Sequence, residues 1–159
     1  MLFGPSKPVI GKASVVVDVP REQIFQFVGE SFFENYPRWS PEVIKLEAVK
    51  GEGIALGNVM RQVRVDHGHK SESTFKVAEL DPPHKLVFEG VSNAYRCIYE
   101  FEEEGELGEA TRLSFTFVFP ELEMMLRPFE KLVRVAVQEG ASRTARNLKG
   151  LIESRSKAA

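Results

Sequence analysis

The fold is decided by residues 110–155, ATRLSFTFVFPELEMMLRPFEKLVRVAVQEGASRTARNLKGLIESR. Along 110–119, apolar side chains occupy the odd positions from Leu113 to Phe119, and mostly polar ones occupy the even positions. This alternation predicts a β-strand with one buried face. From Glu121 to about Arg155 the apolar residues recur every three or four positions, which predicts a long amphipathic helix.

Upstream of this stretch, β-branched and alternating segments predict six more strands, over residues 12–19, 43–49, 59–66, 70–80, 85–91 and 94–102. Short turns join most of these strands, so neighbours should pair antiparallel. Two short helices are expected between the first two strands. One starts at Asp18 and Pro20 and ends at Gly29, and the other runs from Ser31 until Pro37 stops it.

The predicted class is therefore α+β, with a seven-stranded curved antiparallel sheet wrapped around the long C-terminal helix. The length of 159 residues suits one domain. We expect a flexible leader over residues 1–11, the domain over 12–155 and a short tail over 156–159. No basic-then-apolar leader or long apolar run is visible, so the expected location is cytoplasmic, with no integral membrane segment.

Charge and cysteine content exclude several function classes. The formal net charge of −2 argues against a nucleic-acid binder. The one cysteine excludes an internal disulfide framework and a zinc site built from cysteines alone. His67 and His69 flank Gly68 in a predicted hairpin turn, and we interpret them as exposed turn residues rather than metal ligands. We expect no metal and no cofactor, and the sequence does not indicate an oligomeric state.

The inward faces of the predicted strands combine aromatic side chains with a few polar ones. Odd positions are assigned inward on 59–66, which makes Arg61 the charged residue of that face. An apolar interior with a few polar groups is typical of a small-molecule cavity, but a filled core would show the same pattern. The candidate cavity residues are Trp39, Arg61, Val63, Phe75, Phe88, Tyr95, Cys97, Tyr99, Phe115, Phe117, Phe129, Leu132, Val133 and Ala136.

The order of elements and several motifs resemble the START-like, or helix-grip, superfamily of SRPBCC type, which includes polyketide cyclase/dehydrase and lipid-transport proteins. The resemblance covers residues ~12–155. It rests on the stretches VVDVPREQIF (16–25), YPRWSPEV (36–43), GN (57–58), VAELDPPHKL (77–86) and TRLSF (111–115), together with the terminal helix. It implies a cavity between the sheet and the long helix, but the motifs are specific for the fold rather than for one function.

The sequence favours binding of a small hydrophobic or amphipathic molecule in this cavity. Arg61, Tyr95 and Tyr99 are expected to orient the polar end of that ligand, with the ligand or Glu139 as the counter-charge of Arg61. Two alternatives stay open: a polyketide aromatase/cyclase-like enzyme, and an interaction module like the chaperone activators of this superfamily. The sequence carries no recognisable catalytic signature, so whether the protein is an enzyme is left undecided.

Two further features have two interpretations each. Glu139 and Arg143 could reach the cavity mouth or form an exposed pair on the long helix. Trp39 could fix its loop against the end of the sheet, or gate the cavity entrance together with Phe32 and Phe33.

Overall fold

The computed structural model describes residues 7–158 and confirms the predicted fold class. Seven antiparallel strands form one sheet in the order β1-β7-β6-β5-β4-β3-β2. The strands are β1 (Val9–Val17), β2 (Val43–Lys50), β3 (Val59–Asp66), β4 (His69–Asp81), β5 (Lys85–Gly90), β6 (Arg96–Glu104) and β7 (Ala110–Phe119). The helices are α1 (Arg21–Phe25), the π-helical turn η1 (Gln26–Glu30), α2 (Phe32–Trp39), the 3₁₀ segment η2 (Met124–Phe129) and α3 (Glu130–Ala158).

The ends of several elements differ from the sequence-based expectation. Strand β1 already begins at Val9, so only part of the expected leader lies before it, and residues 1–6 are outside the described chain. Helix α1 is preceded by Pro20 rather than capped by Asp18. Helix α2 continues through Pro37 to Trp39, because a proline removes only one backbone N–H, and Ser40 N–H still donates to the Tyr36 carbonyl at 2.9 Å.

The C-terminal helix starts later and ends later than expected. Residues 124–129 form a 3₁₀ segment that contains Pro128, and the regular α-helix begins only at Glu130. Proline lacks an N–H and fits the first turn of a helix, which explains why α3 starts just beyond it. The helix then runs to Ala158, so most of the expected tail is helical.

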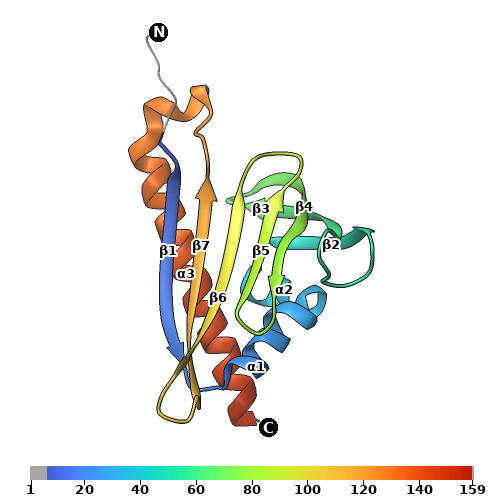
Figure 1. Cartoon of the computed structure of the whole chain (residues 1–159). Helices are drawn as coiled ribbons and strands as arrows, with labels where there is room; N and C mark the ends of the chain where they lie inside the picture. The colour runs from blue at the N-terminus through green and yellow to red at the C-terminus, as the bar shows by residue number, and fades with distance from the viewer. Residues whose placement is uncertain (1–6, 159) are drawn as a thin grey trace.

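Helix α3 lies along β1 and β7, while α1, η1 and α2 gather near the C-terminal end of α3 (Figure 1). Gly11 on β1 permits the close approach of α3, since a Cβ there would sit 2.5 Å from the Val137 carbonyl oxygen. The next residue of α3, Gln138, bonds both the N–H and the carbonyl of Lys12, at 3.1 and 2.9 Å. The helix is therefore fastened to the sheet along one edge.

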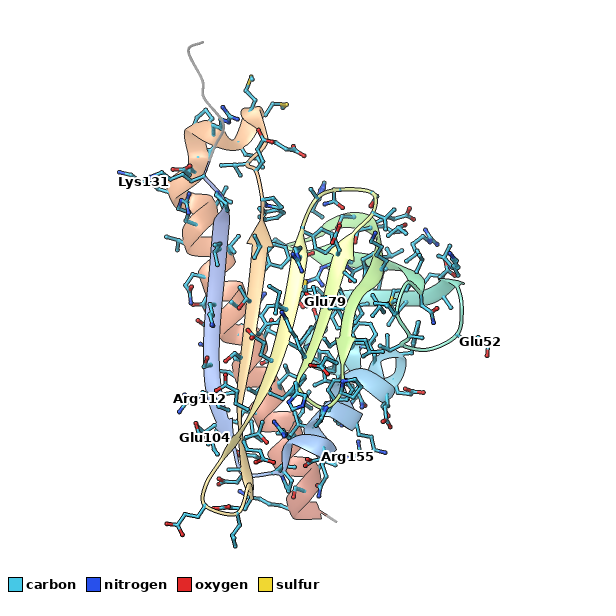
Figure 2. All side chains as sticks on the ribbon, in the orientation of Figure 1. Glu52, Glu79, Glu104, Arg112, Lys131 and Arg155 are labelled. Carbon is cyan, nitrogen blue, oxygen red and sulfur yellow. The ribbon has the colours of Figure 1, made fainter. Side chains whose placement is uncertain are left out.

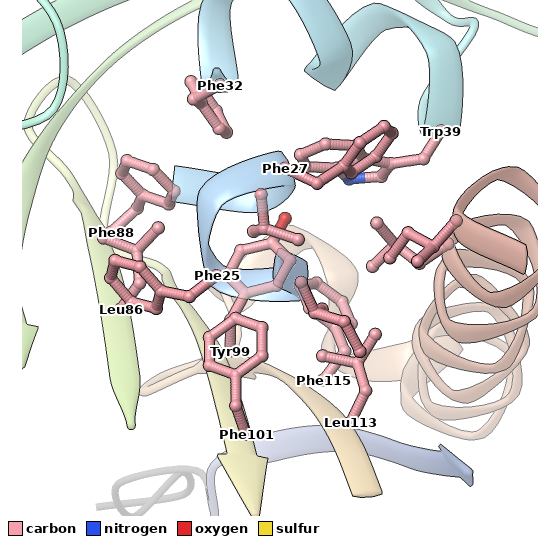
Figure 3. Close-up of a cluster of buried hydrophobic side chains, with 14 of the residues drawn as sticks. Phe25, Phe27, Phe32, Trp39, Leu86, Phe88, Tyr99, Phe101, Leu113 and Phe115 are labelled. Carbon is pink, nitrogen blue, oxygen red and sulfur yellow. The ribbon is translucent and has the colours of Figure 1, made fainter. Parts of the chain in front are cut away.

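The hydrophobic core lies where α1, α2 and the C-terminal half of α3 meet the sheet (Figure 3). Phe32 is buried at its centre, stacked on Tyr36 with ring centroids 4.7 Å apart and packed on Phe88 at 4.6 Å. From α3, the core receives Ala141, Leu148 and Ile152. Charged side chains such as Glu104, Arg112 and Lys131 point away from it (Figure 2). No helix within the described residues is long and apolar enough to cross a membrane.

Candidate functional site

A cavity of about 540 Å³ separates the sheet from the middle of α3. Its apolar wall is formed by aromatic side chains of β6 and β7 on one side and small or aliphatic residues of α3 on the other. Tyr95 stacks on Phe117 with centroids 5.7 Å apart, and Tyr99 packs on Phe115 at 5.0 Å. The α3 side consists of Val133, Ala136, Val137, Gly140, Ala141 and Thr144.

A chain of hydrogen bonds crosses the polar end of the cavity from α2 to β6. The Tyr36 hydroxyl donates to Gln62 Oε1 (2.9 Å), and Gln62 Nε2 donates to Ser73 Oγ (3.0 Å). Ser73 Oγ and the Tyr95 hydroxyl lie 3.1 Å apart and share one hydrogen bond. Gln62 and Ser73 face each other across β3 and β4, which fixes the middle of this chain on paired strands.

Arg64 extends this chain toward the cavity mouth. Its Nη1 donates to the Tyr36 hydroxyl and to Ser40 Oγ, both at 3.1 Å. Two carboxylates balance its charge: Asp66, which accepts from Nε and Nη2 at 3.3 Å each, and Glu42 at 3.7 Å. The cation of Arg64 is therefore already paired in the protein itself.

Two contacts join α3 to the segment between α2 and β2 at the same end. Arg143 lies 3.4 Å from the Glu42 carboxylate, and Asn147 Nδ2 donates to the Trp39 carbonyl at 2.9 Å. Glu139 pairs with Arg146 at 3.1 Å on the exposed side of the helix. The interpretation of Glu139 and Arg143 as a pair is therefore wrong, because Glu42 and Arg146 provide the partners. Of the two residues, Arg143 lines the cavity and Glu139 does not.

Burial keeps the hydroxyl and thiol groups of the cavity protonated. It raises the pKa of Tyr95 to about 12 and that of Cys97 to about 12. The pKa values of Tyr36 and Tyr99 are also raised, chiefly by burial. At neutral pH these groups can donate hydrogen bonds to a guest.

The inward orientation expected for Arg61 is wrong. Arg61 pairs with Glu47 and Glu72, each at 2.7 Å, on the face of the sheet turned away from the cavity. The inward residues of β3 are Met60, Gln62 and Arg64, so the even positions face the interior. Val63 is buried but does not line the cavity, for the same reason.

Two residues expected to line the cavity from the C-terminal helix also lie elsewhere. Phe129 and Leu132 are 54% and 70% exposed. They lie at the η2–α3 junction and are not among the residues that line the cavity, so the expectation that Phe129 and Leu132 line it is wrong. Phe75 and Phe88 face inward but are packed in the aromatic core rather than against open space.

The remaining expected residues line the cavity, namely Trp39, Tyr95, Cys97, Tyr99, Phe115, Phe117, Val133 and Ala136. Sequence reasoning missed the polar residues Tyr36, Ser40, Glu42, Gln62 and Arg64. A signal existed for two of them. The odd positions of β4, which include Phe75 and Val77, face inward with Ser71 and Ser73, and antiparallel pairing puts Arg64 and Gln62 directly opposite these serines.

His67 lies in the turn between β3 and β4, and His69 is the first residue of β4; both are exposed. Within residues 7–158, no group of three histidine, cysteine, aspartate or glutamate side chains is placed to hold a metal ion.

Solved structures share the fold at low sequence identity. The Zhui aromatase/cyclase from Streptomyces sp. R1128 superimposes with a TM-score of 0.75 at 16% identity, covering 93% of this chain and 95% of that one. The protein TTHA0849 from Thermus thermophilus gives 0.71 at 22% identity, covering 92% and 99%. SA2116 from Staphylococcus aureus, a protein of unknown function, gives 0.72 at 14%, covering 95% and 97%. At these identities the likeness shows the fold alone.

No curated protein sequence matches the chain. Residues 9–153, which span nearly the whole described structure, match the sequence family described as polyketide cyclase/dehydrase and lipid transport. The match includes every strand and the cavity-lining part of α3. The chain therefore belongs to the polyketide cyclase/dehydrase and lipid transport family.

Proposed function

We propose that the protein binds a small, mainly apolar molecule with a polar end in the cavity between the sheet and α3. The observation that carries this proposal is the cavity itself, of about 540 Å³, with aromatic and aliphatic walls and polar groups gathered at one end. Small-molecule sites have this volume range and this composition. The family description, which includes lipid transport, supports the same class of function.

Gly140 indicates that the space is open rather than filled by side chains. It lines the cavity from α3, and a Cβ added there would meet no atom within 4 Å. A glycine inside a helix costs about 1 kcal/mol relative to alanine. Gly140 thus lowers the stability of the helix at a position where any side chain would occupy the cavity.

Binding is favoured over the two alternatives by the placement of particular residues. The cyclase interpretation required Arg61, Tyr95 and Tyr99 to converge inside the cavity, and Arg61 lies on the other face of the sheet. The interaction-module interpretation required a filled interior. Met125, Phe129 and Leu132 do expose apolar surface, but the interior contains open space.

Native mass spectrometry of freshly purified protein is the first test, because a retained ligand appears as added mass. Titration with the fluorescent probe 1-aminoanthracene is the second. We expect saturable binding to the wild-type protein and its loss in Gly140→Phe, whose ring would occupy the cavity. Gly150→Phe is the matched control, because Gly150 is exposed on the same helix and has equally open surroundings.

The two variants make the test decisive. Equal probe binding by Gly140→Phe and Gly150→Phe would place the probe outside the cavity. Absence of both a retained ligand and probe binding in the wild-type protein would refute the proposed function.

A further inference from the structure

The three tyrosines of the chain all line the cavity, but their hydroxyl groups differ in what they already bind. Tyr36 accepts from Arg64 and donates to Gln62, and Tyr95 shares a hydrogen bond with Ser73. No described residue accepts a hydrogen bond from the Tyr99 hydroxyl, although only 3% of this residue is exposed. Because Tyr99 lines the cavity, its free donor marks a place where a ligand can supply the acceptor.

Trp39 provides a second, independent observation at the same place. This residue is 1% exposed, and its indole N–H has no hydrogen-bond partner among residues 7–158. Its ring meets that of Tyr99 at 6.2 Å and 73°, and the nearby indole N–H offsets part of the effect of burial, which raises the pKa of Tyr99. When Tyr99 donates to an acceptor, its oxygen becomes a better acceptor for Trp39, because hydrogen bonds in a chain polarise one another. One ligand oxygen would therefore accept directly from the Tyr99 hydroxyl and would strengthen the interaction of the Trp39 N–H with the Tyr99 oxygen.

The charges at the cavity mouth argue against an anionic ligand. Arg64 is paired with Asp66 and Glu42, and Arg143 is paired with Glu42 as well. An incoming carboxylate would have to compete with carboxylates already in place and would be repelled by them. A neutral ligand is not repelled by these carboxylates.

On the basis of the proposed function, we infer that the ligand is a neutral ring compound with a ketone-type acceptor oxygen, and that the Tyr99 hydroxyl donates a hydrogen bond to this oxygen. The aromatic wall beside Tyr99, formed by Phe115 and continued by Phe117, accommodates the ring system. This assignment makes Tyr99 the residue that distinguishes such a ligand from a hydrocarbon of the same shape.

The test uses three rigid competitors that displace bound 1-aminoanthracene: 9-fluorenone, fluorene and fluorene-9-carboxylate. Fluorenone and fluorene have nearly the same shape and differ by one carbonyl oxygen. We expect wild-type protein to bind fluorenone about fivefold more tightly than fluorene, the ratio that one neutral hydrogen bond provides. The carboxylate should bind more weakly than both.

Variants locate the donor. Tyr99→Phe should abolish the preference for fluorenone while leaving fluorene affinity unchanged. Its melting temperature should stay close to that of the wild type, because the Tyr99 hydroxyl donates to no described residue and the ring stays in place. Tyr95→Phe is the matched control at the residue just before β6, and it should keep the preference.

The possible failures are distinguishable. Equal affinity of the wild type for fluorenone and fluorene, or tightest binding of the carboxylate, would overturn the inference and leave cavity binding intact. A preference lost in Tyr95→Phe but kept in Tyr99→Phe would overturn the assignment to Tyr99. Failure of all three competitors and of 1-aminoanthracene itself to bind would refute the proposed function and the inference with it.

Discussion

Gly11 on β1 and Val137 on α3 lie so close that a single added carbon on Gly11 would sit 2.5 Å from the Val137 carbonyl oxygen. This separation is below any normal contact between a side-chain carbon and a backbone atom. The position of α3 over the sheet therefore depends on the absence of a side chain at residue 11.

Gly11→Ala should destabilise the protein by about 1–3 kcal/mol, the usual cost of forcing extra volume into a packed contact. Urea denaturation followed by circular dichroism measures this loss. Gly150→Ala, at an open position on α3, should instead be neutral or slightly stabilising. Equal stability of Gly11→Ala and the wild type would mean that α3 shifts at no cost.

Arg61 and Arg64 occupy opposite faces of β3 and offer a matched pair of substitutions. Arg61→Met removes two ion pairs with partly exposed partners and should have little effect on stability. Arg64→Met leaves Tyr36, Asp66 and Glu42 without their common partner and should cost about 2 kcal/mol. Thermal unfolding of both variants at low salt provides the comparison, and the reverse order would contradict the assigned faces.

The buried Cys97 thiol and the tyrosines predict a loss of stability at alkaline pH. Because burial raises the pKa of Cys97 to about 12, the folded state keeps its proton after an unfolded chain has lost it. Stability should be unaffected by this group below about pH 8 and should fall as pH rises from about 9 toward 12, by up to about 1.4 kcal/mol per pH unit. Tyr95 acts in the same direction above about pH 10.

Urea titrations between pH 7 and 11 test this dependence. Cys97→Ala should have a shallower decline than the wild type between pH 9 and 10, where the thiol of the unfolded chain ionises and its tyrosines do not. Parallel declines for the two proteins would show that Cys97 has an ordinary pKa in the folded state.

Trp39, the single tryptophan, should signal occupancy of the cavity. It is 1% exposed and lines the cavity, so its emission in the ligand-free protein should lie at short wavelength. Binding of fluorenone should quench this emission in proportion to occupancy. The same titration of Gly140→Phe should leave the emission unchanged, and quenching there would indicate a different binding place.

Much of the fold could be predicted from sequence, because alternation and helical periodicity report directly on which face is buried. The same logic failed on β3. Its odd positions carry Val59, Val63 and Val65, which an apolar-inward rule turns to the interior. The true inward set includes Gln62 and Arg64, because this part of the interior is the polar end of a cavity rather than a packed core. A rule based on apolar burial misplaces residues where a binding site needs polar groups.

Phe129 illustrates a different limit. It continues the apolar stripe of α3 in register, and periodicity alone cannot tell where the facing sheet ends. Pro128 and the 3₁₀ segment η2 place this residue beyond the cavity, where 54% of it is exposed. The length of the facing strands, rather than the helical pattern, decides which part of the stripe is covered.

The two sides of α3 are held to the rest of the protein by different numbers of contacts, which bears on the rate of ligand entry. One side of the helix packs along the whole of β1. On the side that faces the cavity mouth, polar contacts come from the Glu42–Arg143 ion pair and the Asn147–Trp39 hydrogen bond. Arg143 is half exposed in the ion pair with Glu42, so dissolved salt weakens this contact. We expect a ring-sized guest to enter where these two contacts open, and stopped-flow binding of fluorenone to become faster as ionic strength rises.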